Sequence, residues 1–242
     1  MGIDQQQLLD NEHGRAMLNP GHNEAGLSLI ELLIGVTVMG ILLVMGLPSF
    51  KNWIQNTQIR TSTEAIQNGL ELARAEAVRR NTQVRFQLTT SLDNTCALSK
   101  ISGNWVVSLD DPTGNCAGAK LNDGFLINDT ANNLAPRILQ VRQAGEGSRN
   151  VAVNSQEVGG GAQIYDGSIT FNGVGRIIST SVTPGDSIQI DITNPAVGGD
   201  CISAGGPMRC LRVTVSTGGL IRACNPLWSI IPTQSNYDPQ GC

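Results

Sequence analysis

The chain has 242 residues, including 28 glycines and 10 prolines, and only 15% of its residues are charged. This length suits one globular domain with an appendage, and the composition favours strands and loops over a helical bundle. The formal net charge is −4, and such a weak charge excludes a general electrostatic attraction to nucleic acid or anionic lipid.

The first element is a 21-residue apolar run at residues 27–47, LSLIELLIGVTVMGILLVMGL. As a helix it would be about 30 Å long, which is enough to cross the hydrocarbon core of a bilayer. The run is too long for a secretory signal peptide, and the small residues Ala25 and Gly26 precede it instead of following it. The pattern therefore predicts a cut before the run that leaves the transmembrane helix on the mature chain.

Glu31 interrupts this run near its beginning. An acidic group in hydrocarbon costs at least ~2.5 kcal/mol on insertion scales, so intramembrane carboxylates usually have partners. One interpretation is that Glu31 reaches the headgroups, because it lies one turn from the end. The other is that it pairs with a positive group, such as the new N-terminal amine of a neighbouring subunit.

The helical pattern continues past Pro48 to about Asn81. Its apolar face has spacings of three, four and seven residues, which are typical of an amphipathic helix. Glu71 with Arg74, and Glu76 with Arg80, are spaced to pair along its polar side. The face comprises Ile59, Ile66, Leu70, Ala73 and Ala77.

The remainder of the chain reads as antiparallel β structure. Alternating apolar residues predict strands at 84–88, 169–171, 188–192 and 211–215, and apolar runs suggest further strands at 105–109 and 138–141. Clusters rich in Gly, Asn, Asp and Pro separate them. The predicted fold class is α+β, with a long N-terminal helix packed on an antiparallel β-sheet domain.

The six cysteines contain no C-x-x-C pair, which argues against a zinc ribbon or a thioredoxin-type site. Beyond a membrane anchor, six cysteines indicate three disulfides in an oxidising compartment. Sequence alone leaves the connectivity open, and nearest-neighbour pairing is our prediction because it closes the shortest loops. The predicted pairs are Cys96–Cys116, Cys201–Cys210 and Cys224–Cys242.

The segment Gly26-Leu27-Ser28-Leu29-Ile30-Glu31, with the apolar run and Pro48, resembles the N-terminus of type IV pilins and type II secretion pseudopilins. Three further segments resemble the GspH/FimT/FimU subgroup, whose members are minor pilins or pseudopilin H. Together these matches span most of residues 26–224. The three segments are LELARAEAVRR at 70–80, ITFNGVGR at 169–176 and RVTVSTGGLIRAC at 212–224.

The resemblance implies that a prepilin peptidase cuts between Gly26 and Leu27 and that Leu27 is then N-methylated. It implies that Glu31 sets the register between subunits during assembly. Leu27 stands where the family usually has Phe, and the leader is acidic where basic residues are usual. Met17 is an alternative start to Met1 and would give a ten-residue leader.

The implied organisation has four parts. Residues 1–26 are the leader, 27–47 the transmembrane segment, 48–81 the amphipathic half of the helix, and 82–242 a periplasmic β-rich domain with a C-terminal Cys loop. The protein would be single-pass in the inner membrane before it enters a pilus or pseudopilus filament. Its partners would be the prepilin peptidase, other minor and major pilins or pseudopilins, and the inner-membrane assembly platform.

The leading hypothesis is a minor pilin in the tip or initiation complex of a type IV pilus, with a role in pilus biogenesis, twitching or adhesion. Pseudopilin H of the type II secretion system is the alternative. A second alternative is a DNA-binding minor pilin for natural transformation. For that role the family uses Gly-Arg-x-Arg, and here the positions Gly219 to Arg222 retain only Arg222 as a DNA contact, so the sequence does not favour a nucleic-acid partner.

An enzyme is the weakest hypothesis. Both histidines, His13 and His22, lie in the predicted leader, so the mature chain would contain no imidazole for catalysis or metal binding. The sequence contains no G-x-x-x-x-G-K-[ST], G-x-S-x-G or H-E-x-x-H motif. We therefore predict no catalytic residue, no metal site and no cofactor.

Overall fold

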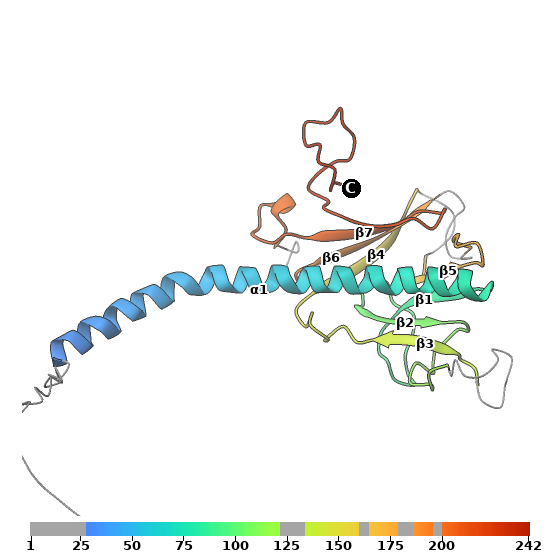
Figure 1. Ribbon diagram of the computed structural model, residues 1–242, viewed down its shortest axis with the longest axis horizontal. Coiled ribbons are helices and arrows are strands. Elements are labelled where there is room, and N and C mark those ends of the chain that lie inside the picture. Colours follow the sequence, from blue (N-terminus) through green and yellow to red (C-terminus); the bar gives the residue numbers. More distant parts are fainter. Residues whose placement is uncertain (1–27, 122–133, 160–164, 179–185, 196–199) are drawn as a thin grey trace, which may run out of the picture. The chain divides into compact units, whose positions relative to one another are not determined.

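The structure is a computed structural model that describes residues 28–121, 134–159, 165–178, 186–195 and 200–242, without the side chains of 45–49 (Figure 1). Helix α1, Leu29–Arg80, is followed by the β strands. The chain divides into two compact units at Gly46/Leu47. The first unit contains the beginning of α1, and the second contains the rest of α1 and every described strand.

In the second unit, α1 buries the apolar face that its periodicity predicts. Ile59, Ile66 and Leu70 are 0–1% exposed, and the alanines of the same face are fully buried. Glu76 accepts a hydrogen bond from Arg80 at 2.6 Å, as the spacing predicts, whereas Arg74 Nε donates to the carbonyl of Gly175 at 3.3 Å. The amphipathic pattern of this half of the helix is confirmed.

The end of α1 has a specific cap. Asn81 adopts a positive φ of 48°, and its N–H donates to the Val78 carbonyl at 3.2 Å. The N–H of Thr82 donates to the Ala77 carbonyl at 3.1 Å. This pair of bonds is a Schellman motif with asparagine in the left-handed position, which satisfies carbonyls that a helix end leaves free.

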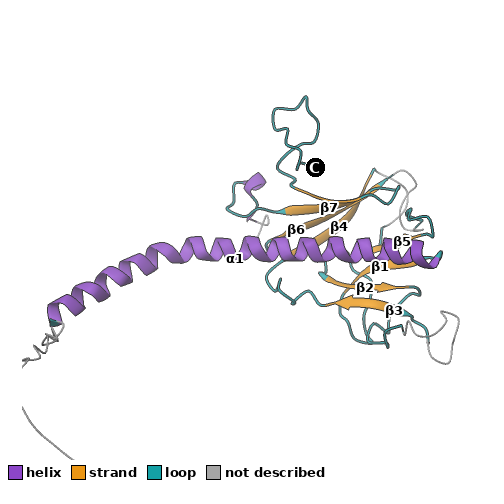
Figure 2. Ribbon diagram, in the orientation of Figure 1, coloured by secondary structure: helices purple, strands orange, loops and turns teal. Residues whose placement is uncertain are grey.

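The strands form two four-stranded antiparallel sheets (Figures 1 and 2). One sheet has the order β3-β2-β1-β5, and the other has the order β4-β6-β7-β8. The bounds of the first are β1 Val84–Thr89, β2 Asn104–Ser108, β3 Ile138–Arg142 and β5 Ser168–Phe171. Those of the second are β4 Ala152–Val158, β6 Ser187–Thr193, β7 Leu211–Val215 and β8 Ile221–Cys224.

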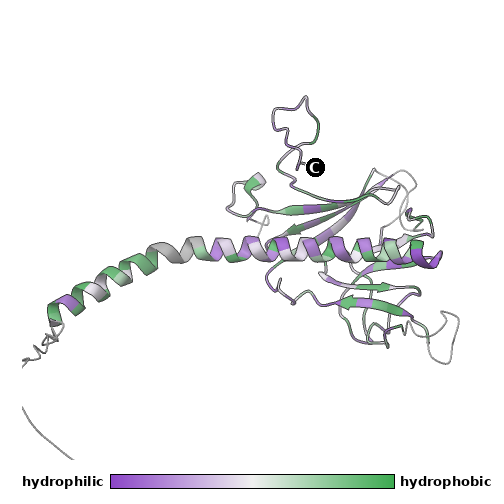
Figure 3. Ribbon diagram, in the orientation of Figure 1, coloured by the Kyte–Doolittle hydropathy of each residue, from purple (hydrophilic) through white to green (hydrophobic). Residues whose placement is uncertain are grey.

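One hydrophobic core joins the buried face of α1 to both sheets. The first sheet contributes Phe86 and Trp105, whose rings are 5.6 Å apart, and the second contributes alternate residues of β6 and β7. Figure 3 shows the corresponding mixture of hydrophobic and hydrophilic residues along these elements. Trp105 is only 2% exposed, so its indole is part of this core.

The structure departs from the predicted strands at β4 and β8, which the sequence patterns do not indicate. In β4 the buried position opposite Ile190 is Ser155, whose hydroxyl donates to the hydroxyl of Tyr165 at 2.8 Å. In β8, Ala223 is exposed and only Ile221 and Cys224 are buried. Neither strand therefore has the apolar alternation by which the other strands are recognised.

Gly69 is the position where α1 approaches the first sheet closely. A Cβ added there would lie 2.9 Å from Cε2 of Phe86 and 3.0 Å from Cζ2 of Trp105, and both rings are buried. We expect Gly69→Ala to lower the free energy of unfolding by about 1–3 kcal/mol, because overpacking exceeds the gain in helix propensity of about 1 kcal/mol. Urea unfolding of the full chain in detergent micelles measures this.

Asn68 is the matched control for Gly69, because it is the neighbouring residue and is exposed. Asn68→Ala makes a comparable change to helix propensity without meeting the core, so it is expected to change stability by less than about 0.5 kcal/mol. A Gly69→Ala variant as stable as Asn68→Ala would contradict the close approach.

Candidate assembly surface

The proposed processing site lies outside the described residues. This applies to Gly26, Leu27, both candidate starts and the rest of the leader. The side chains at positions 45–47, the last of the predicted transmembrane segment, are also outside the description. The boundaries 1–26, 27–47, 48–81 and 82–242 stay predictions.

Glu31 lies in the first turn of α1. The carbonyl of Ser28 accepts the N–H of Leu32 at 3.1 Å, so Ser28 occupies the N-cap position and Glu31 the third helical position. Ser and Glu at this spacing are typical of a capping box, and a negative charge in a first turn is favoured by the helix dipole. The helix end therefore tolerates the carboxylate while it lacks an external partner.

The side chains around Glu31 are apolar and exposed to solvent. Ile30 is 62% exposed and Leu32 is 61% exposed, and the large apolar side chains continue in this way to Val44. Figure 3 shows the same segment as a stretch of hydrophobic residues. Exposed apolar surface of this extent marks an interaction site.

Among the described residues, the structure has no helix that is both long enough and apolar enough to cross a membrane.

An aromatic pair follows the apolar segment. The rings of Phe50 and Trp53 stack with their centroids 5.9 Å apart, and more than half of each side chain is exposed. Lys51 lies between them and is also exposed. Trp53 beside a lysine is the arrangement that is enriched at membrane–water interfaces.

The structure joins the six cysteines in nearest-neighbour order, as Cys96–Cys116, Cys201–Cys210 and Cys224–Cys242. The second disulfide closes the loop that carries the short 3-10 helix η2, Ile202–Ala204. This loop is attached to α1, because Asn56 Oδ1 accepts the N–H of Arg209 at 2.7 Å. The third disulfide ties the C-terminal residue to the end of β8.

Arg222 is a second attachment point for the C-terminal tail, in addition to the third disulfide. Its Nη2 donates to the carbonyls of Pro239, at 2.7 Å, and Gly241, at 3.0 Å. The tail also pairs with the end of β8, because Asn225 N–H donates to the Gln240 carbonyl at 2.8 Å. These contacts give Arg222 a structural task that its sequence pattern does not indicate.

Asp110, just after β2, and Arg137, just before the neighbouring β3, form an ion pair with two side-chain hydrogen bonds. Arg137 Nε donates to Asp110 Oδ2 at 2.7 Å, and Nη2 donates to Oδ1 at 2.6 Å. These hydrogen bonds hold the pKa of Asp110 below its usual value and raise the pKa of Arg137. Asp110 precedes a proline turn, where a solvated carboxylate is the simplest expectation, so its partner is a finding of the tertiary structure.

The Asp110–Arg137 pair gives stability a defined pH dependence. Because the folded-state pKa of Asp110 is lowered, the stabilisation is complete above the unfolded pKa of about 3.9 and is lost as the pH falls through the folded value. We expect Asp110→Asn to cost about 1–2 kcal/mol at pH 7, with a smaller difference from the native chain near pH 2. Unfolding at a series of pH values measures it.

Glu64→Gln is the control, because the Arg60–Glu64 pair is 2.8 Å long but exposed. Exposed pairs contribute little, so this variant is expected to be as stable as the native chain at every pH. An Asp110→Asn variant whose deficit stays constant down to pH 2 would disprove the assignment of the pH dependence.

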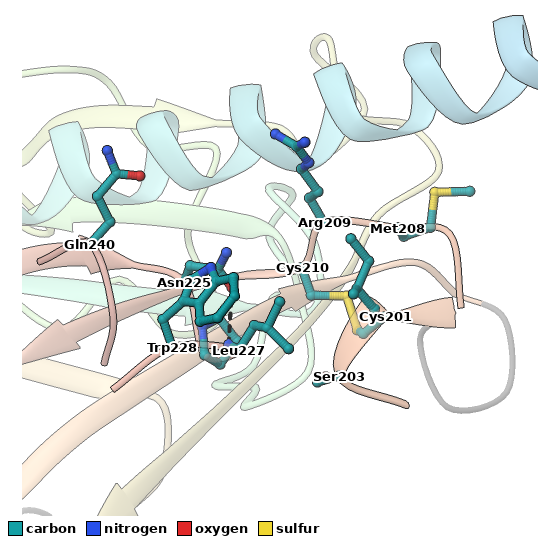
Figure 4. Close-up of a pocket in the computed structure, with 11 residues that line it drawn as sticks. Cys201, Ser203, Met208, Arg209, Cys210, Asn225, Leu227, Trp228 and Gln240 are labelled. Carbon is teal, nitrogen blue, oxygen red and sulfur yellow. Dashed lines mark hydrogen bonds between the residues drawn. A yellow bond between two sulfur atoms is a disulfide. The ribbon is translucent and has the colours of Figure 1, made fainter. Parts of the chain in front are cut away.

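Two hollows lie beside the C-terminal tail. The smaller, of about 270 Å³, is lined by the Cys201–Cys210 disulfide, Trp228 and their neighbours. The larger, of about 820 Å³, is a groove between α1, from Trp53 to Gln67, and the end of the second sheet. Arg209 lines both, and Figure 4 shows its side chain directed toward the helix and away from the disulfide.

Within the described residues, no group of three or more His, Cys, Asp or Glu side chains is arranged to hold a metal ion.

The chain matches the sequence model described as Type II transport protein GspH over residues 62–219, which is more than half of its length. It matches the prokaryotic N-terminal methylation motif over residues 21–47. Two crystal forms of the type IV minor pilin FimU from Pseudomonas aeruginosa (strain PAO1) are similar at 16% identity over 68% of this chain. They are covered to 86% and 90%, with TM-scores of 0.37 and 0.35. Among curated proteins no match is found.

Proposed function

Because this chain belongs to the GspH family of pilin-like type II transport proteins, we propose that it is a minor subunit in the tip or initiation complex of a type IV pilus. The family and the N-terminal methylation motif make it a minor pilin or pseudopilin, a structural protein and not an enzyme. The finer assignment to the pilus tip is our proposal. The exposed apolar segment of α1 from Leu29 to Val44, which contains Glu31, supports assembly into a filament, and the C-terminal tail supports the pilus tip.

The proposed mechanism begins in the inner membrane. The prepilin peptidase would cut between Gly26 and Leu27, and methylation would follow on Leu27. The exposed apolar side chains from Leu29 to Val44 would first contact lipid and then the helices of neighbouring subunits. Close packing between helices replaces the lipid contacts, so the subunit can leave the bilayer without exposing this surface to water.

Glu31 would supply the register of this packing. Once packing excludes water from these apolar side chains, the carboxylate is stabilised further by a positive group that reaches it. The free N-terminal amine of an adjacent mature subunit is such a group. A subunit displaced by a turn would leave both charges without a partner, so the pair would select one axial position.

The C-terminal tail favours the pilus over type II secretion as the machine. The tail is closed by Cys224–Cys242 and exposes Trp228, Ile230, Ile231 and Tyr237 to the extent of 39–49%. An apolar loop held rigid by a disulfide and by Arg222 suits a contact surface on a terminal subunit. Pseudopilin H of a secretion system remains the alternative.

Deletion of the gene and complementation with the native chain tests this proposal. We expect the deletion strain to lose surface pili and twitching motility while its secreted enzymes stay at the native level. Loss of secretion with normal pili would assign the chain to the secretion alternative. Retention of both activities would overturn the proposed role in filament initiation.

DNA capture through Arg222 is not favoured by its contacts. Both described hydrogen bonds of Arg222 Nη2 go to carbonyls of the tail, so this part of the guanidinium already binds within the protein. If Arg222 nevertheless contacts phosphates, DNA affinity should fall steeply with salt because counterions are released. The absence of a DNA mobility shift at low salt would end this hypothesis.

A further inference from the structure

The four outer edges of the two sheets are not equivalent. Three of them, on β3, β4 and β5, each take part in a backbone hydrogen bond with a segment outside the sheet. On β3, the carbonyl of Ile138 accepts the N–H of Leu121 at 2.6 Å. On β4, the N–H of Ser155 donates to the carbonyl of Lys100 at 2.7 Å, and on β5 the carbonyl of Thr170 accepts the N–H of Ile178 at 2.9 Å. Within the described part of the chain, no such bond reaches residues 221–224 of β8, the fourth edge.

The strand alternation identifies the groups on this edge. Leu220 accepts the N–H of Ser216 at 3.0 Å, so alternate residues of β8 face β7 and the residues between them face outward. Asn225 is on the outward side, and its N–H is taken by the Gln240 carbonyl. Ala223, two residues earlier, has the same orientation, and its N–H and carbonyl form the open part of the edge.

This open edge faces the larger groove. Ala223 lines the groove together with Leu211 of β7, and α1 forms the opposite wall from Trp53 to Gln67. That length of helix is about 21 Å, which matches an extended chain of about six residues. A groove beside an unpaired strand edge is the arrangement that proteins use to bind a peptide by strand addition.

The charges in the groove indicate which kind of extended segment would bind there. Arg60 and Glu64 neutralise each other at 2.8 Å, whereas the Arg209 guanidinium extends toward α1 in the groove. An acidic side chain on the incoming segment would therefore find a complementary charge. A second copy pairing edge to edge through β8 is disfavoured, because antiparallel pairing would bring two Arg222 side chains together.

We propose that the outer edge of β8 binds an extended, acidic segment of a different filament subunit as an added strand. The backbone of that segment would pair with Ala223, and a carboxylate would reach Arg209. This inference rests on the proposed function for the identity of its partner. It gives the globular domain a directional contact with a neighbour, separate from the packing of α1.

Ala223→Pro tests the backbone contact. The change removes the outward N–H, which is not part of the β7–β8 ladder, and proline is tolerated on an edge in that orientation. We expect incorporation into filaments to fall at least tenfold, with processing and thermal midpoint close to native values. Ala223→Ser keeps the N–H and is the matched control, with native incorporation expected.

Arg209→Glu tests the charge and is expected to reduce incorporation at least fivefold. Arg149→Glu reverses an exposed arginine that does not line the groove, and it should have no effect. If the Ala223→Pro variant misfolds, the incorporation of the Arg209→Glu variant still tests the proposal. Native incorporation of the Arg209→Glu variant, or of a correctly folded Ala223→Pro variant, would overturn the proposal.

A photo-crosslinker identifies the occupant. p-Benzoylphenylalanine in place of Gln67, in the groove, is expected to capture another pilin-type subunit in assembled filaments, whereas at the neighbouring exposed Asn68 it should not. Capture of a second copy, or no capture from a chain that is incorporated, would overturn the strand-addition model. If the native chain enters no filament at all, the proposed function itself is wrong.

Discussion

Replacement of Glu31 by valine is expected to abolish most incorporation into filaments while leaving cleavage at Gly26/Leu27 intact. The reason is that the carboxylate is exposed on an apolar helix surface and its partner would be supplied only by a neighbouring subunit. A loss of at least tenfold, about 1.4 kcal/mol, is expected for a charge pair formed in a medium of low dielectric constant. Quantitative immunoblotting of sheared filaments against total processed protein measures the ratio.

Thr37→Val is the matched control for Glu31. Thr37 lies in the same exposed segment, but its hydroxyl donates to the carbonyl of Ile34 at 2.8 Å, within its own helix. Its removal adds apolar surface without removing an intersubunit partner, so incorporation should stay within about twofold of the native level. Normal incorporation of Glu31→Val would refute the register role and leave the packing role of the helix standing.

Leu70→Ala is expected to cause a large loss of folding stability. Leu70 is fully buried in the hydrophobic core that α1 shares with both sheets, so truncation leaves a cavity in that core. Such changes cost about 2–5 kcal/mol. Denaturant unfolding of the full chain in micelles, followed by the fluorescence of the buried Trp105, gives the value.

Val78→Ala is the control for Leu70, because Val78 lies on the same helix but is 51% exposed. It removes apolar atoms that are already in contact with water, so the expected change is within about 0.5 kcal/mol. A Leu70→Ala variant that loses less than about 1 kcal/mol would show that α1 is not the centre of the core.

Several features of the molecule can be predicted from sequence because they depend on local spacing. The buried face of α1 follows from a period of 3.6 residues, and the strands β1, β5, β6 and β7 follow from a period of two. The N-terminal motif is contiguous, so its resemblance to pilins needs no tertiary information. The cysteines are joined to their nearest neighbours in the chain, which are the pairs that close the shortest loops.

The features that could not be predicted from local sequence patterns are contacts between residues far apart in the chain. Arg137 bonds to Asp110 where the neighbouring strands β2 and β3 meet, and Arg222 bonds to the carbonyls of the tail. In both cases the partners are so far apart in the chain that the side-chain types do not predict the pairing. Gly69 resembles any helical glycine until the rings of Phe86 and Trp105 are placed beside it. The division of the eight described strands into two sheets likewise depends on pairing between distant segments.

The sequence by itself determined the long N-terminal helix, the position of Glu31 in it and the family. Each of these depends on consecutive residues whose chemistry does not depend on the fold. Only the tertiary structure decided which strand edge stays open and which groove lies beside it. Three edges each receive a backbone hydrogen bond from a segment outside their sheet, whereas on β8 the tail bonds only at Asn225, just past the strand, and among the described residues no such bond reaches 221–224. Every residue other than proline carries the same backbone donor and acceptor, so side-chain type does not reveal which of these groups are paired, and the course of the chain decides it.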